Sequence, residues 1–276
     1  MSEVRRQRAV ITGAGDGIGR ALAIQLNQRG IDLWLCDIDQ ARLEATKELL
    51  SKTDCHVDLA VVDCGNQVDI ETWAARISAE IDELDFLFNN AGVAYGARFE
   101  DVSFDNFEWL ININFWGVVW CTKAFLPLLT KSPASHLVNL SSIFGMIGVP
   151  TQTAYNAAKF AVRGFSESLQ TEYRGTSLKV TCVHPGGIAT NIARRARMDG
   201  EDAATVTADE RDESFRKMAK TSPEKAADII IRGTLKGKKR IIVGLDAWFI
   251  QIVTKVFPTG YQALTARLGQ GDDVVV

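Results

Sequence analysis

A chain of 276 residues with 46% hydrophobic and 24% charged residues has the composition of a globular protein with a large buried core. Its formal net charge of -3 gives no electrostatic reason to expect nucleic acid or an acidic membrane surface as a partner. No apolar run approaches the length that spans a bilayer, so we expect no membrane span.

The N-terminus and the cysteines both favour a cytoplasmic protein. The first residues lack the apolar stretch and the small-residue cleavage site of a signal peptide. The five cysteines are odd in number and show no CxxC spacing, which favours reduced thiols over a disulfide framework or a zinc site. We therefore expect no bound metal.

From residue 8 onward, short apolar runs alternate with longer stretches of helical character. The predicted strands are 8–12, 33–37, 59–63, 86–90, 137–141, 180–184 and 240–244. The predicted helices are 18–29, 41–51, 68–81, 103–130, 154–174 and 223–236. Strands that are apolar throughout are typical of a parallel sheet covered on both faces. The sequence thus predicts a single doubly wound α/β domain of the Rossmann type, with a seven-stranded parallel sheet and helices on both faces.

Two segments depart from this alternation. Residues 192–220 are rich in Arg, Asp, Glu and Ala and show no clear strand, which fits either a lid (192–222) or a solvated pair of charged helices. The tail 247–276 begins with an apolar stretch that could cap the substrate pocket, mediate assembly or touch a membrane surface. Membrane contact is the minor option because the polar face lacks a basic cluster. We predict a catalytic domain over 1–246 and an apolar extension over 247–276, packed on that domain or at an oligomer interface.

A glycine-rich segment joins the first predicted strand to the first helix. The spacing GxGxxG does not fit, because Ile18 occupies its last position; Gly13, Gly17 and Gly19 instead follow Gly-x3-Gly-x-Gly. Such glycines allow a tight turn and let the backbone approach a diphosphate at the positive end of a helix. A purely structural turn is the alternative. Gly15, Asp16 and Ile18 of this predicted phosphate loop are further candidate cofactor contacts.

Carboxylates end the second and third predicted strands. Asp37, about 20 residues beyond the loop, stands where an acidic residue accepts hydrogen bonds from the adenine ribose. Asp37, with Asp39 and Asp16 near it, would repel a 2′-phosphate, although Arg42 and Arg20 could rescue NADP. We therefore predict NAD rather than NADP. Asp63 and the adjacent Cys64 are candidates to contact the adenine, and an ordinary strand-end Asp is nearly as good an explanation.

Tyr155 and Lys159 lie four residues apart on a predicted helix, hence on one face. Lowering a phenol pKa from about 10 by two or three units requires roughly 3–4 kcal/mol. A cation about 4 Å away, at an effective dielectric near 20, supplies on the order of 4 kcal/mol. Lys159 together with a positively charged nicotinamide could therefore make Tyr155 an acid/base.

Ser141 and Ser142 end the fifth predicted strand, where ligands meet an open α/β sheet. When Ser142 is included, five motifs over residues 8–246 resemble, in order and spacing, those of the short-chain dehydrogenase/reductase family. They are Thr12-Gly-x3-Gly-x-Gly19, Asn89-Asn90-Ala91-Gly92, Asn114-x-x-Gly117, Ser142 and Tyr155-x3-Lys159. His184-Pro185-Gly186-Gly187 and Thr190 look like the segment that meets the nicotinamide half of the cofactor in that family.

The resemblance implies a role for each matching residue. Tyr155 is the general acid/base, Lys159 lowers its pKa and binds the nicotinamide ribose, and Ser142 orients the substrate. Asn114 holds a water in a proton relay; Asn112 competes but lacks the Gly three residues later. The resemblance favours Ser142 over Ser141. The remaining cofactor contacts are predicted at Asn90, Ala91 and Gly92 on the adenosine side, and at Pro185, Gly186, Ile188 and Thr190.

Other classes of function fit less well. A hydrolase lacks support because the chain has three histidines and neither a GxSxG elbow nor an HExxH motif. A catalytically silent dinucleotide sensor of the same fold is the serious alternative, but Ser142, Tyr155 and Lys159 are all present. Apolar residues after Ser142, in 93–99 and in 186–192 suggest a lipophilic secondary alcohol or ketone as the small-molecule substrate. The family usually assembles through two long helices, here 103–130 and 154–174, so we expect a homodimer or homotetramer.

Overall fold

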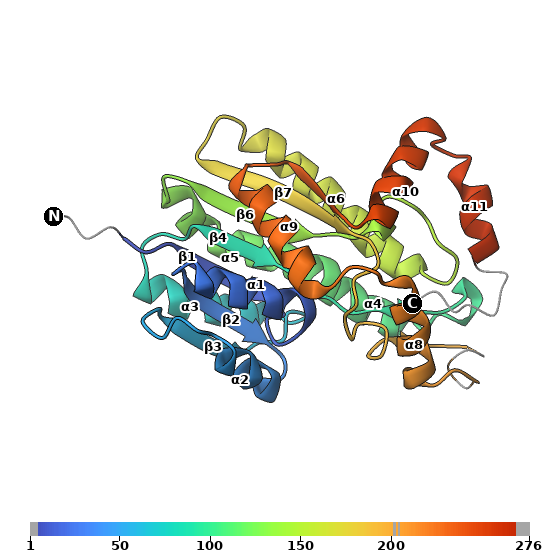
Figure 1. The fold of residues 1–276 in the computed structure, drawn as a ribbon, viewed down its shortest axis with the longest axis horizontal. Helices are drawn as coiled ribbons and strands as arrows, with labels where there is room; N and C mark the ends of the chain where they lie inside the picture. The colour runs from blue at the N-terminus through green and yellow to red at the C-terminus, as the bar shows by residue number, and fades with distance from the viewer. Residues whose placement is uncertain (1–4, 201–202, 204, 269–276) are drawn as a thin grey trace.

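All seven apolar runs pair in one parallel sheet in the computed structural model, which describes residues 5–268 other than 201, 202 and 204. The strand order is β3-β2-β1-β4-β6-β7-β9 (Figure 1). The strands are β1 (Arg8–Thr12), β2 (Asp32–Asp37), β3 (Val57–Val61), β4 (Phe86–Asn89), β6 (Ser135–Leu140), β7 (Leu178–Pro185) and β9 (Arg240–Val243). The predicted fold class is confirmed: this is a doubly wound Rossmann-type sheet.

Helices cover both faces of the sheet (Figure 1). The first face carries α1 (Gly17–Gln28), α2 (Gln40–Glu48) and α9 (Pro223–Leu235). The second carries α3 (Gln67–Glu80), α5 (Gly117–Lys131) and α6 (Thr153–Glu172). Neighbouring strand residues alternate between two cores, with Ile11 in the first and Val10 in the second. This double burial explains why the strands are apolar at consecutive positions.

The strand order reverses between β1 and β4, which is the switch point where open α/β sheets bind ligands. Helices α8 (Ala208–Met218), α10 (Leu245–Val256) and α11 (Tyr261–Leu268) lie beyond the carboxyl ends of the strands (Figure 1). The predicted extension 247–276 therefore contains most of α10 and all of α11, and its residues 269–276 lie outside the described part of the chain.

Two details differ from the expected elements. Strand β3 ends at Val61, so Asp63 does not end it; the carboxylate of Asp63 accepts a hydrogen bond from the Gly65 amide at 2.8 Å, in a turn that follows the strand. The segment 192–220, expected to contain no strand, contributes β8 (Arg197–Met198), which pairs with β5 (Tyr95–Gly96) in a second small sheet. Two-residue strands are too short for a periodicity signal.

One helical stretch, Phe104–Lys131, is the only part of the described chain long and apolar enough to cross a membrane by length and composition, with a hydropathy of 1.2. From the sequence we expected no apolar run of this length. The stretch packs against β4, β6 and α3, and 44% of its most apolar window is buried. One side of the stretch therefore packs on the sheet and on α3, as in a covering helix of a globular domain.

Candidate active site

The glycine loop after β1 is tightly packed at the switch point. Gly13 and Gly17 have φ of 65° and 52°, in the left-handed region that favours glycine. A Cβ on Gly13 would lie 2.9 Å from the Cα of Ala91, and one on Gly19 would overlap the carbonyl oxygen of Gly13. Ile18 packs against the first core. This loop opens α1 and has the close backbone packing that a diphosphate at a helix N-terminus requires.

The segment after β4 braces this loop. The carboxamide of Asn90 donates to the carbonyl oxygens of Thr12 and Gly13 at 2.9 and 3.1 Å. The Thr12 hydroxyl accepts from the amides of Asn90 and Ala91, both at 3.0 Å. The side chain of Asn90 is thus engaged with the loop itself. A Cβ on Gly92 would lie 3.4 Å from Lys159 Nζ, so Gly92 borders the catalytic half of the site.

Asp37 is 9% exposed at the end of β2 and faces the glycine loop. Its carboxylate accepts from the amides of Gly15 and Asp39, at 3.0 and 3.2 Å. Arg42 lies 3.5 Å from Asp37 and 2.8 Å from Asp39, so two carboxylates engage this guanidinium. Arg20 donates instead to Thr46, at 3.0 Å. Both arginines that could rescue NADP are therefore engaged inside the protein.

Asp63 and Cys64 follow β3 near the same edge of the sheet. Asp63 caps its own turn, and the Cys64 side chain is buried. All five cysteines are free and buried. Within the described residues, no group of three or more His, Cys, Asp or Glu side chains is placed to hold a metal ion.

Asp16 joins the glycine loop to the segment 192–222. One carboxylate oxygen accepts from the Gly17 amide at 2.8 Å, which caps α1. The other accepts from Asn191 at 2.8 Å and lies 2.9 Å from Arg195. Burial opposes ionisation, but the bonds from Asn191 and Gly17 and the charge of Arg195 hold the pKa of Asp16 below its usual range. The sequence predicted Asp16 as a cofactor contact, but it did not indicate these contacts with Asn191 and Arg195.

The turn after β7 is hydrogen-bonded to β9 and to the first turn of α10. The amide of Gly186, next to Pro185, donates to the Val243 carbonyl at 2.8 Å, and the Gly187 amide donates to Asp246 at 2.6 Å. Ile188 is buried, and the methyl group of Thr190 lies 2.9 Å from where a Cβ of Gly17 would be. The sequence did not indicate Asp246 or Asn191 as site residues, because neither belongs to a motif.

Ser142, Tyr155 and Lys159 come together where β6 ends and α6 begins. The Ser142 side chain accepts from the Phe144 amide at 3.1 Å and is hydrogen-bonded to Tyr155. Lys159 Nζ donates to the Leu140 carbonyl at 3.1 Å and lies 5.5 Å from the centre of the Tyr155 ring. Ser141 faces away, since its hydroxyl donates to the Lys159 carbonyl at 2.8 Å. The two serines thus have different partners, Ser142 the Tyr155 side chain and Ser141 the backbone of Lys159.

Burial governs the ionisation of this pair. It raises the pKa of Tyr155 to about 12, and the hydrogen bond with Ser142 opposes the rise. Burial also lowers the pKa of Lys159 to about 8. The predicted lowering of the Tyr155 pKa involves the charged nicotinamide as well as Lys159, and it stays a prediction. At neutral pH Tyr155 is a neutral phenol that can donate a proton.

Asn114 lies in a π-helical turn, η2 (Asn112–Trp116), which interrupts the predicted helix 103–130 after α4 (Phe104–Ile111). It is fully buried, and its carboxamide accepts from the Val93 amide and donates to the Val93 carbonyl, both at 2.8 Å. Its Oδ1 borders the same Gly92 position as Lys159 Nζ. Such turns occur often at functional sites.

A model of the family described as short chain dehydrogenase matches residues 7–201. The chain belongs to this family. It is 43% identical to SadH of Mycobacterium tuberculosis, named as an oxidoreductase, over 96% of each protein. It is 30% identical to human estradiol 17-beta-dehydrogenase 11, over 94% of this chain and 81% of that protein.

Solved structures agree with this assignment. A short chain dehydrogenase/reductase of Burkholderia phymatum in complex with NAD superposes with a TM-score of 0.81 at 25% identity, covering 100% of this chain and 99% of that one. This short-chain dehydrogenase is therefore an oxidoreductase whose cofactor is a nicotinamide dinucleotide. The glycine loop fits that group, since its positive-φ glycines and close backbone packing place the N-terminus of α1 at the switch point of the sheet.

Proposed function

We propose that this protein transfers a hydride between NAD(H) and a secondary alcohol or ketone. The observation that carries the proposal is the meeting of the Ser142 hydroxyl, the Tyr155 phenol and the Lys159 ammonium beside the glycine loop. The bound dinucleotide supplies or accepts the hydride. Everything else is the work of the protein's own side chains.

Tyr155 acts as the general acid in reduction and as the base in oxidation. Its neutral phenol donates a proton to the substrate oxygen, which gains negative charge as a carbonyl is reduced. Ser142 holds that oxygen by a hydrogen bond. Lys159, 5.5 Å from the ring centre, stabilises the phenolate that remains. Asn114, next to Lys159 at Gly92, holds a water that returns the proton from solvent.

NAD is the cofactor we favour over NADP. Asp37 and Asp39 present two carboxylates at the position of the adenine ribose, and both engage Arg42. A 2′-phosphate there meets two negative charges and an arginine already paired. A comparison of kcat/KM for NAD and NADP tests this choice, and a preference for NADP would contradict it.

The proposed substrate is lipophilic. Ile143 and Phe144 are partly exposed after Ser142, and Met146 and Ile147, which follow them, are buried. The edge of the Phe144 ring faces Tyr155 with 6.0 Å between ring centres, so an apolar group lies next to the reacting atoms. A relative named as an estradiol dehydrogenase is consistent with such a substrate. Turnover of small charged hydroxy acids without turnover of apolar ketones would contradict this choice.

The Tyr155→Phe variant tests the mechanism. It removes the proton that catalysis needs and keeps the ring, so we expect NADH affinity within about twofold of wild type and a loss of turnover of about 100-fold or more. NADH fluorescence titration measures the first quantity, and NADH absorbance with a panel of ketones measures the second. Unchanged turnover would exclude Tyr155 as the acid. A wild-type protein that binds NADH and reduces none of the ketones would favour a silent sensor.

We also propose that the enzyme works as an oligomer in the cytoplasm. Its free, buried thiols suit a reducing compartment. Apolar side chains along the two long helical stretches remain exposed, among them Trp116 just before α5 and Phe160 on α6, the helices expected to pair.

A further inference from the structure

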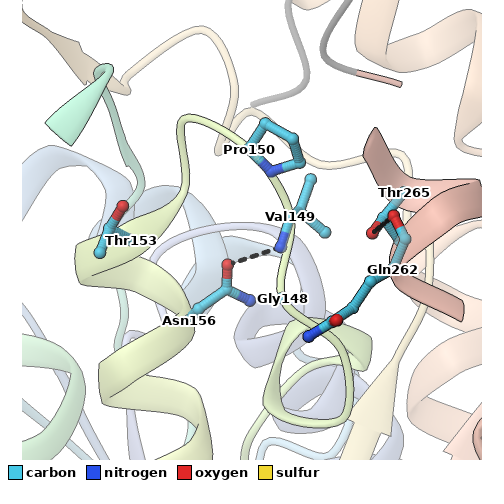
Figure 2. A pocket seen from close by; sticks show the side chains of 7 residues that line it. All are labelled: Gly148, Val149, Pro150, Thr153, Asn156, Gln262 and Thr265. Carbon is cyan, nitrogen blue, oxygen red and sulfur yellow. Dashed lines mark hydrogen bonds between the residues drawn. The ribbon is translucent and has the colours of Figure 1, made fainter. Parts of the chain in front are cut away.

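The residue after Tyr155 points away from the substrate and into the loop that follows Ser142. Asn156 is 8% exposed, and Figure 2 shows its carboxamide beneath Val149. Its oxygen accepts from the Val149 amide at 3.1 Å. Its nitrogen donates to the carbonyls of Phe144 and Ile147, both at 2.7 Å. The carboxamide thus uses both N–H groups and its oxygen on one loop.

This loop carries the groups that face Tyr155. The amide of Phe144 donates to the Ser142 side chain at 3.1 Å, and the Phe144 ring meets the Tyr155 ring edge-on at 88°. Phe144 is therefore bonded to Asn156 through its carbonyl and to Ser142 through its amide. A change at Asn156 reaches both Ser142 and Tyr155 through this one residue.

The outer side of the loop is less firmly supported. A pocket of 390 Å³ separates it from α11, with Val149 and Pro150 on one wall and Gln262 and Thr265 on the other (Figure 2). The Tyr261 hydroxyl accepts from the Gly148 amide at 3.3 Å across this side. On the inner side, Met146 packs against Ile242 and Ala247, and the side-chain hydrogen bonds of Asn156 tie Phe144, Ile147 and Val149 to α6.

We propose that Asn156 is a positioning residue for the reaction. Its carboxamide fixes residues 144–149 so that the Ser142 hydroxyl and the Phe144 ring face Tyr155. The assignment rests on the proposed roles of Ser142 and Tyr155. Asn156 itself contacts no reacting group.

A matched control separates positioning from stability. Asn27 is also buried and also ties a loop, accepting from the Lys52 amide at 2.8 Å and donating to the Lys52 carbonyl at 3.1 Å. It lies at the end of α1 that is remote from the glycine loop. Asn27→Ala therefore removes a similar buried carboxamide without touching the site.

The kinetic test compares Asn156→Ala with Asn27→Ala. We expect Asn156→Ala to keep NADH affinity within about twofold and to lower kcat for a ketone by roughly 10- to 100-fold, because a displaced Ser142 misaligns the substrate oxygen. Asn27→Ala should keep kcat while losing stability. Equal kcat in wild type and Asn156→Ala, or an equal loss in both variants, overturns the proposal. If Asn156→Ala does not fold, Asn156→Ser, which retains one donor, takes its place.

A second measurement needs no turnover. The chain has four tyrosines, so ¹³Cζ-tyrosine NMR can follow Tyr155, assigned from Tyr155→Phe. The Phe144 ring lies edge-on to the Tyr155 ring, and Ser142 is hydrogen-bonded to the phenol, so displacement of either group should move the ¹³Cζ chemical shift of Tyr155 at neutral pH in Asn156→Ala. The shift should stay in place in Asn27→Ala. An unmoved Tyr155 signal in Asn156→Ala refutes the role of Asn156 whatever the substrate, whereas absent turnover with a moved signal refutes only the proposed function.

Discussion

The residue with the largest conflict between stability and function is Lys159. It is only 4% exposed, and its ammonium group donates to the neutral carbonyl of Leu140. Burial therefore lowers its pKa from 10.5 to about 8. A buried cation held by a neutral partner is costly, and a site keeps it only for its chemistry.

Replacing Lys159 by Met should stabilise the free protein. Below pH 8 both the folded and the unfolded chain bind the proton, and the folded state bears the full cost of burying it; this cost is about 3 kcal/mol for a shift from 10.5 to about 8. Between pH 8 and pH 10.5 the unfolded state binds more protons than the folded state, so the free energy of unfolding of the wild type rises with pH. The stability advantage of Met therefore disappears. Urea unfolding at pH 7 and pH 10 measures the difference. Lys179→Met, at an exposed position, is the control, and a Lys159→Met variant less stable than wild type at pH 7 would contradict the argument.

At this scale the sequence predicted the glycines, Asp37, Ser142, Tyr155 and Lys159, because each belongs to a spaced motif. It could not predict the partners of Asn156, Asp16 or Asp246, since those bonds join segments that only the folded chain brings together. Nor could it predict that burial raises the pKa of Tyr155, because burial is not visible in a spacing of four residues.

At the scale of elements, the segment 192–222 is held at two points near its start. Asn191 and Arg195 bond to Asp16 of the glycine loop. A few residues later, Asp199 accepts from the Tyr95 hydroxyl at 2.5 Å, and Arg197 lies 3.7 Å from the Trp109 ring centre. The first point involves Asp16, the N-cap of α1 in the predicted phosphate loop, and the second joins β5 and α4. If the dinucleotide binds at this loop, the Asp16 contact is the one that we expect to influence its release.

Arg195→Ala should accelerate cofactor release. The pair with Asp16 is partly exposed, with 47% of the arginine side chain accessible, so its loss is worth about 0.2–1 kcal/mol and accelerates release by up to about fivefold. Asp16 keeps its hydrogen bonds from Asn191 and Gly17 in this variant, so the effect should stay moderate. Stopped-flow fluorescence of NADH measures the rate. The adjacent Arg194 pairs with Asp209 at 2.8 Å within residues 192–222, and Arg194→Ala is therefore the control. Equal release rates in the two variants would show that the Arg195–Asp16 pair does not control NADH release.

Elements with a sustained apolar pattern were predictable, and the shortest ones were not. The helix 103–130 was predicted in the right place, but the π-helical turn that orients Asn114 was not, because one extra residue in a turn leaves the apolar pattern nearly unchanged. The two-residue strands β5 and β8 were missed because they are too short to carry any pattern.

For the whole molecule, the architecture was readable because a parallel sheet buried on both faces leaves consecutive apolar residues in every strand. The surface is harder to predict, since sequence alone does not separate an exposed apolar residue from a core one. Helix α10 illustrates this: Ala247 is buried, while Leu245, Phe249 and Ile252 are more than half exposed. Apolar residues are also exposed at Trp116, just before α5, and at Phe160 on α6, where the family resemblance predicts pairing of subunits.

The proposed oligomer can be tested on these two long helical stretches. The most apolar window of Phe104–Lys131 is 44% buried within one chain, so much of an apolar helix faces outward; Trp116 at its middle is 43% exposed and Phe160 on α6 is 39% exposed. An isologous interface doubles each substitution, so Trp116→Glu or Phe160→Glu should convert the oligomer to a monomer. Light scattering after gel filtration measures the mass. Val68→Glu, on α3 at 66% exposure, should leave the mass unchanged. A monomeric wild type would contradict the proposed oligomer. A Phe160→Glu variant that stays assembled would place the interface elsewhere, and the exposed face of α10 would be the next to test.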